Sequence, residues 1–124
     1  MNPDELSERL MNAGVRVGKV VDALPDTRMG RHVAGQLVRC GTSAGPNYEE
    51  GRSAESRRDF IHKLRIALKE LRETRYWLQF CSRSELLTEN RLSEIVTEID
   101  ELVRIVGKSV STAKVASKKP VNDK

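Results

Sequence analysis

The sequence predicts an all-α protein that folds as one antiparallel, up-down-up-down bundle of four helices. Apolar residues recur with alternating steps of four and three along four segments, a spacing that keeps one face of each helix against its neighbours. Apolar and polar residues do not alternate with period two, so strands are not expected. The four segments are joined by short connections, which favour antiparallel neighbours.

The first predicted helix starts at the capping residue Asn2, followed by Pro3 and Glu5, and ends before Pro25. Its core-facing positions are Leu6, Leu10, Ala13, Val17, Val20 and Leu24. The second helix follows, with the core-facing positions Val33, Leu37, Cys40, Ala44 and Asn47.

The stretch from Gly41 to Gly51 is unusual for a helix, because it contains three glycines and Pro46. Two alternatives remain from the residues alone. The second helix either stops near Gly41 or continues with a kink near Pro46. Because the helical spacing of apolar positions continues across the stretch, we expect the kinked helix.

The third and fourth helices have start signals at Ser56 with Asp59 and at Thr88. The third presents Phe60, Leu64, Ala67, Leu71, Thr74, Leu78 and Cys81 to the core. The fourth presents Leu92, Ile95, Ile99, Leu102, Val106 and Val110. We expect residues 1–117 to form the bundle and residues 118–124 to form a flexible polar tail.

Composition limits the class of protein. A chain of 124 residues fits a single domain. Its apolar stretches are too short to span a membrane, so we expect no membrane partner. The acidic first residues lack the pattern of a secretory signal, so we expect a cytoplasmic protein. The two cysteines, Cys40 and Cys81, are far apart and fit neither a disulfide framework nor a zinc site.

Two short motifs are best interpreted as coincidental. Residues 41–45 match G-x-S-x-G, but the strand and sheet that a nucleophilic serine needs are not predicted. Asp59 and His62 match half of a di-iron motif, but the other histidine, His32, has Met29 where the carboxylate should be. We therefore expect no enzyme activity, no metal and no cofactor.

One arc of the third helix is strongly basic. A rotation of about 100° per residue places four cationic side chains opposite the core positions, with Tyr76 beside them and no acid between them. They are Arg58, Arg65, Lys69 and Arg72. Such an arc can bind the phosphates of RNA or DNA without reading sequence, or can serve only solubility.

Several apolar residues fall outside the core positions of their helices. They are Met11, Val15, Ile66, Trp77 and Ile105. Large apolar groups outside a small core commonly form contacts with a partner, so we expect self-association. A polar strip on the second helix faces a flank of the third and is expected to fix helix register or a subunit contact. The strip is Arg39, Ser43, Asn47 and Glu50, and the flank is Asp59, Lys63 and Glu70.

The run from Arg39 to Leu78, RCGTSAGPNYEEGRSAESRRDFIHKLRIALKELRETRYWL, resembles a known bacterial family. Its members are four-helix bundle proteins of the intervening sequences in large-subunit ribosomal RNA genes. With the flanking helices, the resemblance spans about residues 4–116. Pro46 stands where the family usually has Ala.

This resemblance implies an antiparallel bundle that assembles into a homopentameric ring. It also implies kinship with the accessory variability protein of diversity-generating retroelements, a basic pentamer that binds nucleic acid and a reverse transcriptase. The expected function is therefore a non-enzymatic oligomer that binds RNA or DNA through its basic face. The alternative is a protein-interaction scaffold, or an accessory subunit of a reverse transcriptase or other protein, with no direct nucleic-acid role.

Overall fold

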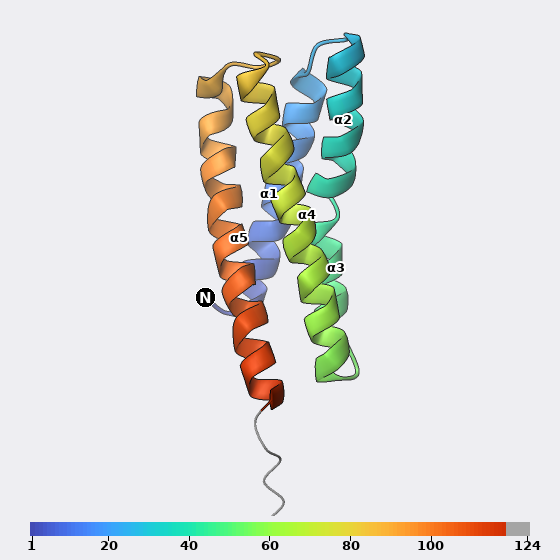
Figure 1. Cartoon of the computed structure of the whole chain (residues 1–124), viewed down its shortest axis with the longest axis vertical. Helices are drawn as coiled ribbons and strands as arrows, with labels where there is room; N and C mark the ends of the chain where they lie inside the picture. The colour runs from blue at the N-terminus through green and yellow to red at the C-terminus, as the bar shows by residue number, and fades with distance from the viewer. Residues whose placement is uncertain (119–124) are drawn as a thin grey trace, which may run out of the picture.

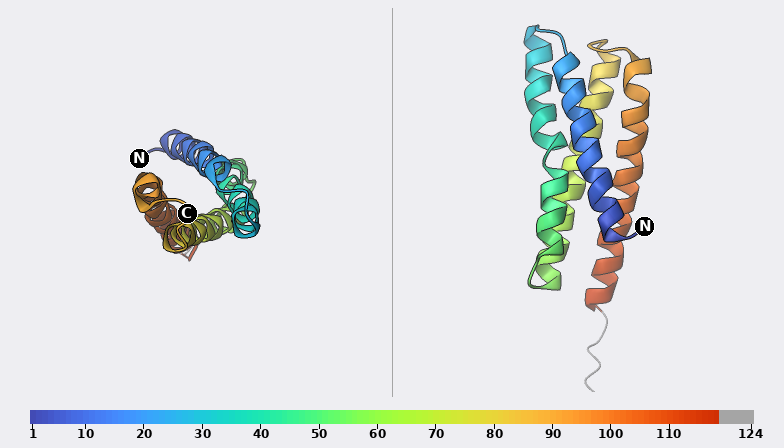
Figure 2. Two further views of the ribbon diagram at one scale, coloured as in Figure 1. Left: turned by 90° about the horizontal axis from the view of Figure 1, so that it is seen from above. Right: turned by 180° about the vertical axis from the view of Figure 1, so that it is seen from behind.

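The computed structural model describes residues 1–118, which form five α-helices arranged in four arms (Figure 1). The helices are α1 (Pro3–Ala23), α2 (Arg28–Gly41), α3 (Ala44–Arg52), α4 (Arg57–Arg83) and α5 (Glu89–Lys118). α2 and α3 follow one another along the same arm, and successive arms run in opposite directions (Figure 1). The arms surround a single core when seen along the bundle (Figure 2). The predicted four-helix bundle is confirmed.

The helix starts follow the predicted capping chemistry. The Asn2 side chain accepts a hydrogen bond from the Glu5 amide at 2.8 Å, and the Glu5 carboxylate accepts one from the Asn2 amide at 2.9 Å. Ser56 accepts from the Asp59 amide at 3.1 Å and starts α4. Thr27, which the sequence reading missed, caps α2 in the same way.

The second arm is interrupted at Thr42 and Ser43, not at Pro46. Pro46 lies in the first turn of α3, where its missing amide hydrogen has no helical partner to lose. The interruption also shifts the buried face of the arm. Tyr48 is buried in α3, while Asn47, expected at the core, is only half-buried.

The core contains most of the predicted positions. Both cysteines lie in it as free thiols, and burial raises the pKa of Cys40 and brings that of Cys81 to about 11. Ile61 is buried in place of Phe60, which is half-buried. The largest fully buried side chains on the four arms are Val17, Val33, Leu37, Leu64, Leu78, Leu92, Ile99, Leu102 and Val106.

α1 approaches the second arm most closely at Gly41. A methyl group placed on Gly41 would lie 2.5 Å from Cγ1 of Val17, and one on Gly14 would lie 3.3 Å from the carbonyl oxygen of Gly41. Gly45, one turn further, faces Leu10. The small residues of the GTSAG stretch thus serve close helix packing.

α5 extends beyond the level at which α1 begins (Figures 1 and 2). Arg9 of α1 forms ion pairs with Glu98 and Glu101 of α5. Since the two helices are antiparallel, α5 continues for about 12 residues past the start of α1, a length of about 18 Å. This end of the bundle is formed without α1, mainly by α3, α4 and α5.

The predicted polar tail begins at residue 118, which is the last residue of α5, and its remaining residues, 119–124, lie outside the described residues. Within the described part of the chain, no helix combines the length and the apolar character that crossing a lipid bilayer requires.

We expect Gly41→Ala to lower the free energy of unfolding by about 1–3 kcal/mol, because the added methyl group meets Val17. The matched control is Gly35→Ala in the same helix, where nothing lies within 4 Å of the added group. There the better helix propensity of Ala should raise stability by about 0.5–1 kcal/mol. Urea unfolding measures both. Equal effects of the two substitutions would contradict a tight crossing at Gly41.

Candidate nucleic-acid interface

The four basic residues of the predicted arc are all exposed on α4. Arg58, Arg65, Lys69 and Arg72 point away from the core. Among residues 1–118, none of the four forms an ion pair. Arg58 and Arg65 also line a hollow at the end of the bundle that lacks α1, together with Asp59, Ile61, His62 and Ser117.

Two other cations on α4 are neutralised by acids of neighbouring helices. Lys63 forms an ion pair of 2.5 Å with Glu50 of α3, and Arg75 forms one of 3.3 Å with Asp100 of α5. The cations of α4 without an ion pair in the described chain are therefore the four of the outward arc, with Arg57 and Arg83 at the two ends of the helix.

α5 adds positive charge beside this arc. The Arg75–Asp100 pair and the contact of Leu68 with Gly107 fix the antiparallel register of α4 and α5. In this register Arg104 lies level with Arg72. Arg104 and Lys108 are exposed, and neither forms an ion pair within the described chain. The sequence reading missed both because it treated each helix alone.

The polar strip and its flank are only partly brought together. Arg39 pairs with Glu70 at 3.3 Å, and Lys63 pairs with Glu50. Asn47 instead donates to Ser43 of its own arm, at 2.9 Å to the carbonyl and 3.1 Å to the hydroxyl oxygen. Asp59 is exposed, and its backbone amide donates to the Ser56 hydroxyl that caps α4.

Glu73 is a member of this network that the sequence reading missed. Its carboxylate accepts hydrogen bonds from Arg39 and from Nε1 of Trp77, which together hold the pKa of Glu73 below its usual range. Glu70 is only 8% exposed, and its carboxylate also forms an ion pair with Arg39. The three-residue spacing of Glu70 and Glu73, which places them on one helix face, was the available signal.

The five apolar candidates lie on three different sides of the bundle. Met11 and Val15 are 64% and 54% exposed on α1. Ile66 is half-buried on α4, as is Trp77, which packs against the core beside His32 of α2. Ile105 of α5 is also half-buried against the core. The structure therefore does not gather the five into one patch.

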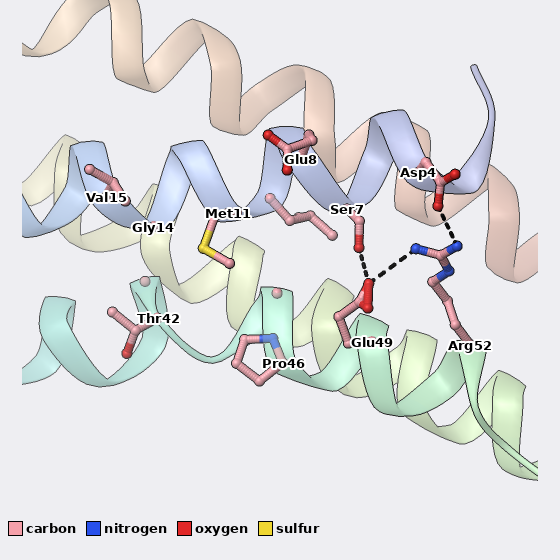
Figure 3. Close-up of a pocket in the computed structure, with 13 residues that line it drawn as sticks. Asp4, Ser7, Glu8, Met11, Gly14, Val15, Thr42, Pro46, Glu49 and Arg52 are labelled. Carbon is pink, nitrogen blue, oxygen red and sulfur yellow. Dashed lines mark hydrogen bonds and ion pairs between the residues drawn. The ribbon is translucent and has the colours of Figure 1, made fainter.

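Met11 and Val15 line a groove of about 800 Å³ between α1 and the second arm (Figure 3). Gly14, Gly41 and Gly45 also line it. Its charged end is ordered by Arg52, which pairs with Asp4 at 2.7 Å and with Glu49 at 3.2 Å. The Ser7 hydroxyl donates to Glu49, and with Arg52 it holds the pKa of Glu49 below its usual range.

The two short motifs do not form a reactive cluster. Ser43 lies at the junction of α2 and α3, and its hydroxyl accepts from Asn47. Asp59 and His62 are both exposed on α4. Within residues 1–118, no three His, Cys, Asp or Glu side chains are placed to hold one metal ion.

Glu73→Gln tests the ion pair with Arg39. Because the folded-state pKa of Glu73 is depressed, its contribution to stability is fully present above the ordinary pKa of a Glu and is lost as the pH falls through the lower folded-state value. We therefore expect the variant to unfold at a lower urea concentration than the wild type at pH 7, with the difference shrinking as the pH falls below the ordinary pKa of a Glu. Glu94→Gln, at an exposed helical Glu that has no ion pair in the described chain, is the control and should show no such trend.

Comparisons with known proteins agree with this architecture. A solved structure from Bacteroides thetaiotaomicron VPI-5482, described as a protein with unknown function from the S23 ribosomal protein family, superimposes with a TM-score of 0.79 at 32% sequence identity. The match covers 85% of this chain and 97% of that one. A comparison with curated proteins finds no match. The family described as 23S rRNA-intervening sequence protein matches residues 5–108. By the extent of that match, and by the agreement in fold, the chain belongs to the 23S rRNA-intervening sequence protein family.

Proposed function

We propose that the protein is a cytoplasmic, non-enzymatic bundle that self-associates and binds RNA or DNA without sequence specificity. The observation that carries this proposal is the outward arc of α4, where Arg58, Arg65, Lys69 and Arg72 are exposed and free of ion pairs within the described chain. Unpaired cations on a rigid helix release counterions when they meet phosphates, which favours binding.

The spacing of the arc fits a phosphate backbone. From Arg58 to Arg72 the helix rises about 21 Å, the axial length of about six base pairs. Arg104 and Lys108 widen the charged surface toward α5. Contacts to phosphates carry no sequence information, so we propose that a row of cations tracking the phosphate backbone does not select a sequence.

Self-association is supported by exposed apolar surface. Thr42, which follows α2, lines the groove together with Met11 and Val15. Val38 of α2 lies one turn before Thr42 and is 45% exposed. Ile66 and Trp77 are further half-buried apolar residues, on α4. Apolar residues on different helices suit head-to-tail contacts, which close into rings when the rotation allows. A ring of five copies is the assembly that we propose from the family resemblance.

The groove also supports the alternative function, a protein-interaction scaffold. An apolar floor with charged residues at one end suits an apolar segment of another protein, such as a reverse transcriptase, as well as a second copy. In that case the basic arc would serve only solubility. Nucleic-acid binding at low salt separates the two functions.

Changing Arg58, Arg65, Lys69 and Arg72 together to Gln should weaken binding to mixed-sequence RNA and DNA by at least about 100-fold at low salt, because four phosphate contacts are lost. Fluorescence anisotropy against salt concentration measures the affinity. For the wild type, we expect affinity to fall steeply as salt rises.

The matched control removes the same charge elsewhere, by changing Arg16, Lys19, Arg28 and Arg91 to Gln. These residues lie on α1, α2 and α5, outside the arc. We expect this variant to lose much less affinity. Equal losses in the two variants would point to net charge and not to the arc, and a wild type that does not bind at low salt would remove the nucleic-acid role altogether.

Val15→Lys should disrupt self-association, because it places a charge in the apolar part of the groove. Light scattering coupled to size-exclusion chromatography should give a multiple of the monomer mass for the wild type and a smaller mass for the variant. Val115→Lys, at a Val that is 60% exposed near the end of α5, is the control. A wild-type monomer at micromolar concentration would exclude self-association, and an unchanged oligomer in Val15→Lys would exclude the groove as the contact.

A further inference from the structure

The basic arc of α4 ends in an exposed aromatic ring. Tyr76 lies four residues after Arg72, so the two side chains are neighbours on one helix face. Tyr76 is 58% exposed, although it is a large ring on an otherwise cationic surface. Tyr76 is not one of the buried residues of the core.

The ring is held in place by other aromatic residues. Its centroid lies 5.0 Å from that of Trp77, with the planes at 87°, and 6.5 Å from that of Phe80. Trp77 is itself fixed by its hydrogen bond to Glu73 and by an edge contact with His32. Tyr76 is therefore a supported ring with much of its surface open, which reduces the entropy lost when a planar ligand stacks on it.

A hollow of about 390 Å³ lies beside this ring, and it is lined by Tyr76, Gln79, Phe80, Arg83 and Ser84. Two aromatic side chains, one amide and one guanidinium thus surround a space of the size that small planar ligands occupy. Arg83 is exposed and free of ion pairs among residues 1–118, so a cation lies on each side of Tyr76 along the helix, Arg72 before it and Arg83 after it.

We propose that this hollow holds an unpaired base of single-stranded nucleic acid, which stacks on Tyr76 while Arg72 and Arg83 contact the flanking phosphates. The inference rests on the proposed function and names its ligand class. In a duplex the faces of the bases are covered by their neighbours in the stack, so a lone exposed ring gains nothing from it. Aromatic stacking combined with cations along a backbone is how proteins bind single strands without strong sequence preference.

Tyr76→Leu tests the inference. It keeps an apolar side chain but removes the ring, and with it the π face. We expect affinity for a mixed-sequence single-stranded 12-mer to fall roughly 5- to 100-fold, with duplex affinity unchanged. Tyr76→Phe keeps the ring and should bind as the wild type does. Anisotropy measures all affinities, and thermal unfolding and light scattering establish that each variant keeps its fold and its assembly.

A second readout reports stacking directly. In a strand carrying 2-aminopurine, the fluorescence of that base should be quenched by the wild type and by Tyr76→Phe, and much less by Tyr76→Leu at saturating protein. If wild type binds single strands and Tyr76→Leu changes neither affinity nor quenching, the hollow does not hold a base, while the proposed function stands. If wild type binds neither single strands nor duplex at low salt, both proposals fail.

Discussion

The close approach of α1 to the second arm at Gly41 is the constraint on which the rest of the structure depends. With no side chain at Gly41, Val17 reaches the backbone of α2, and the crossing places Leu10 against Gly45 and Met11 and Val15 at the surface. Gly14, Gly41 and Gly45 also line the groove, where their missing side chains leave space at the outer surface. The groove and the close helix packing therefore have the same cause. The interruption at Thr42 and Ser43 adjoins this crossing and lets the arm resume as α3.

α4 unites the remaining features because its faces carry different chemistry. One face supplies Leu64, Leu71 and Leu78 to the core. A second face meets the α2–α3 arm through ion pairs that fix helix register. Glu70 and Glu73 pair with Arg39, and Lys63 pairs with Glu50. The third carries unpaired cations and ends in a supported aromatic ring. Charge is thus separated by direction on a single helix, and only the outward direction is left to a partner.

Local signals were enough to predict the four helical arms, the caps of α1 at Asn2 and of α4 at Ser56, and the outward direction of the basic arc, because these depend on residues within a few turns. They left two alternatives for the second arm, a stop near Gly41 or a kink near Pro46, and favoured the one that the structure does not show. Pro46 is tolerated in the first turn of a helix, so the residue that most disfavours helix is not the one at which the helix ends. Contacts between helices could not be predicted from local spacing either. The partial burial of Trp77 depends on its contacts with His32 and Glu73. The position of Arg104 and Lys108 relative to the arc depends on the register of α5 against α4.

The extension of α5 past the start of α1 gives the rod two unlike ends. Short connections between helices close one end, and the other tapers to fewer helices and carries Arg58 and Arg65. Copies related by rotation about a single axis all point the same way along that axis. A self-assembled ring of this kind would have two inequivalent rims. A nucleic-acid strand would then meet a cationic, tapered rim on one side of the ring and a blunt rim on the other.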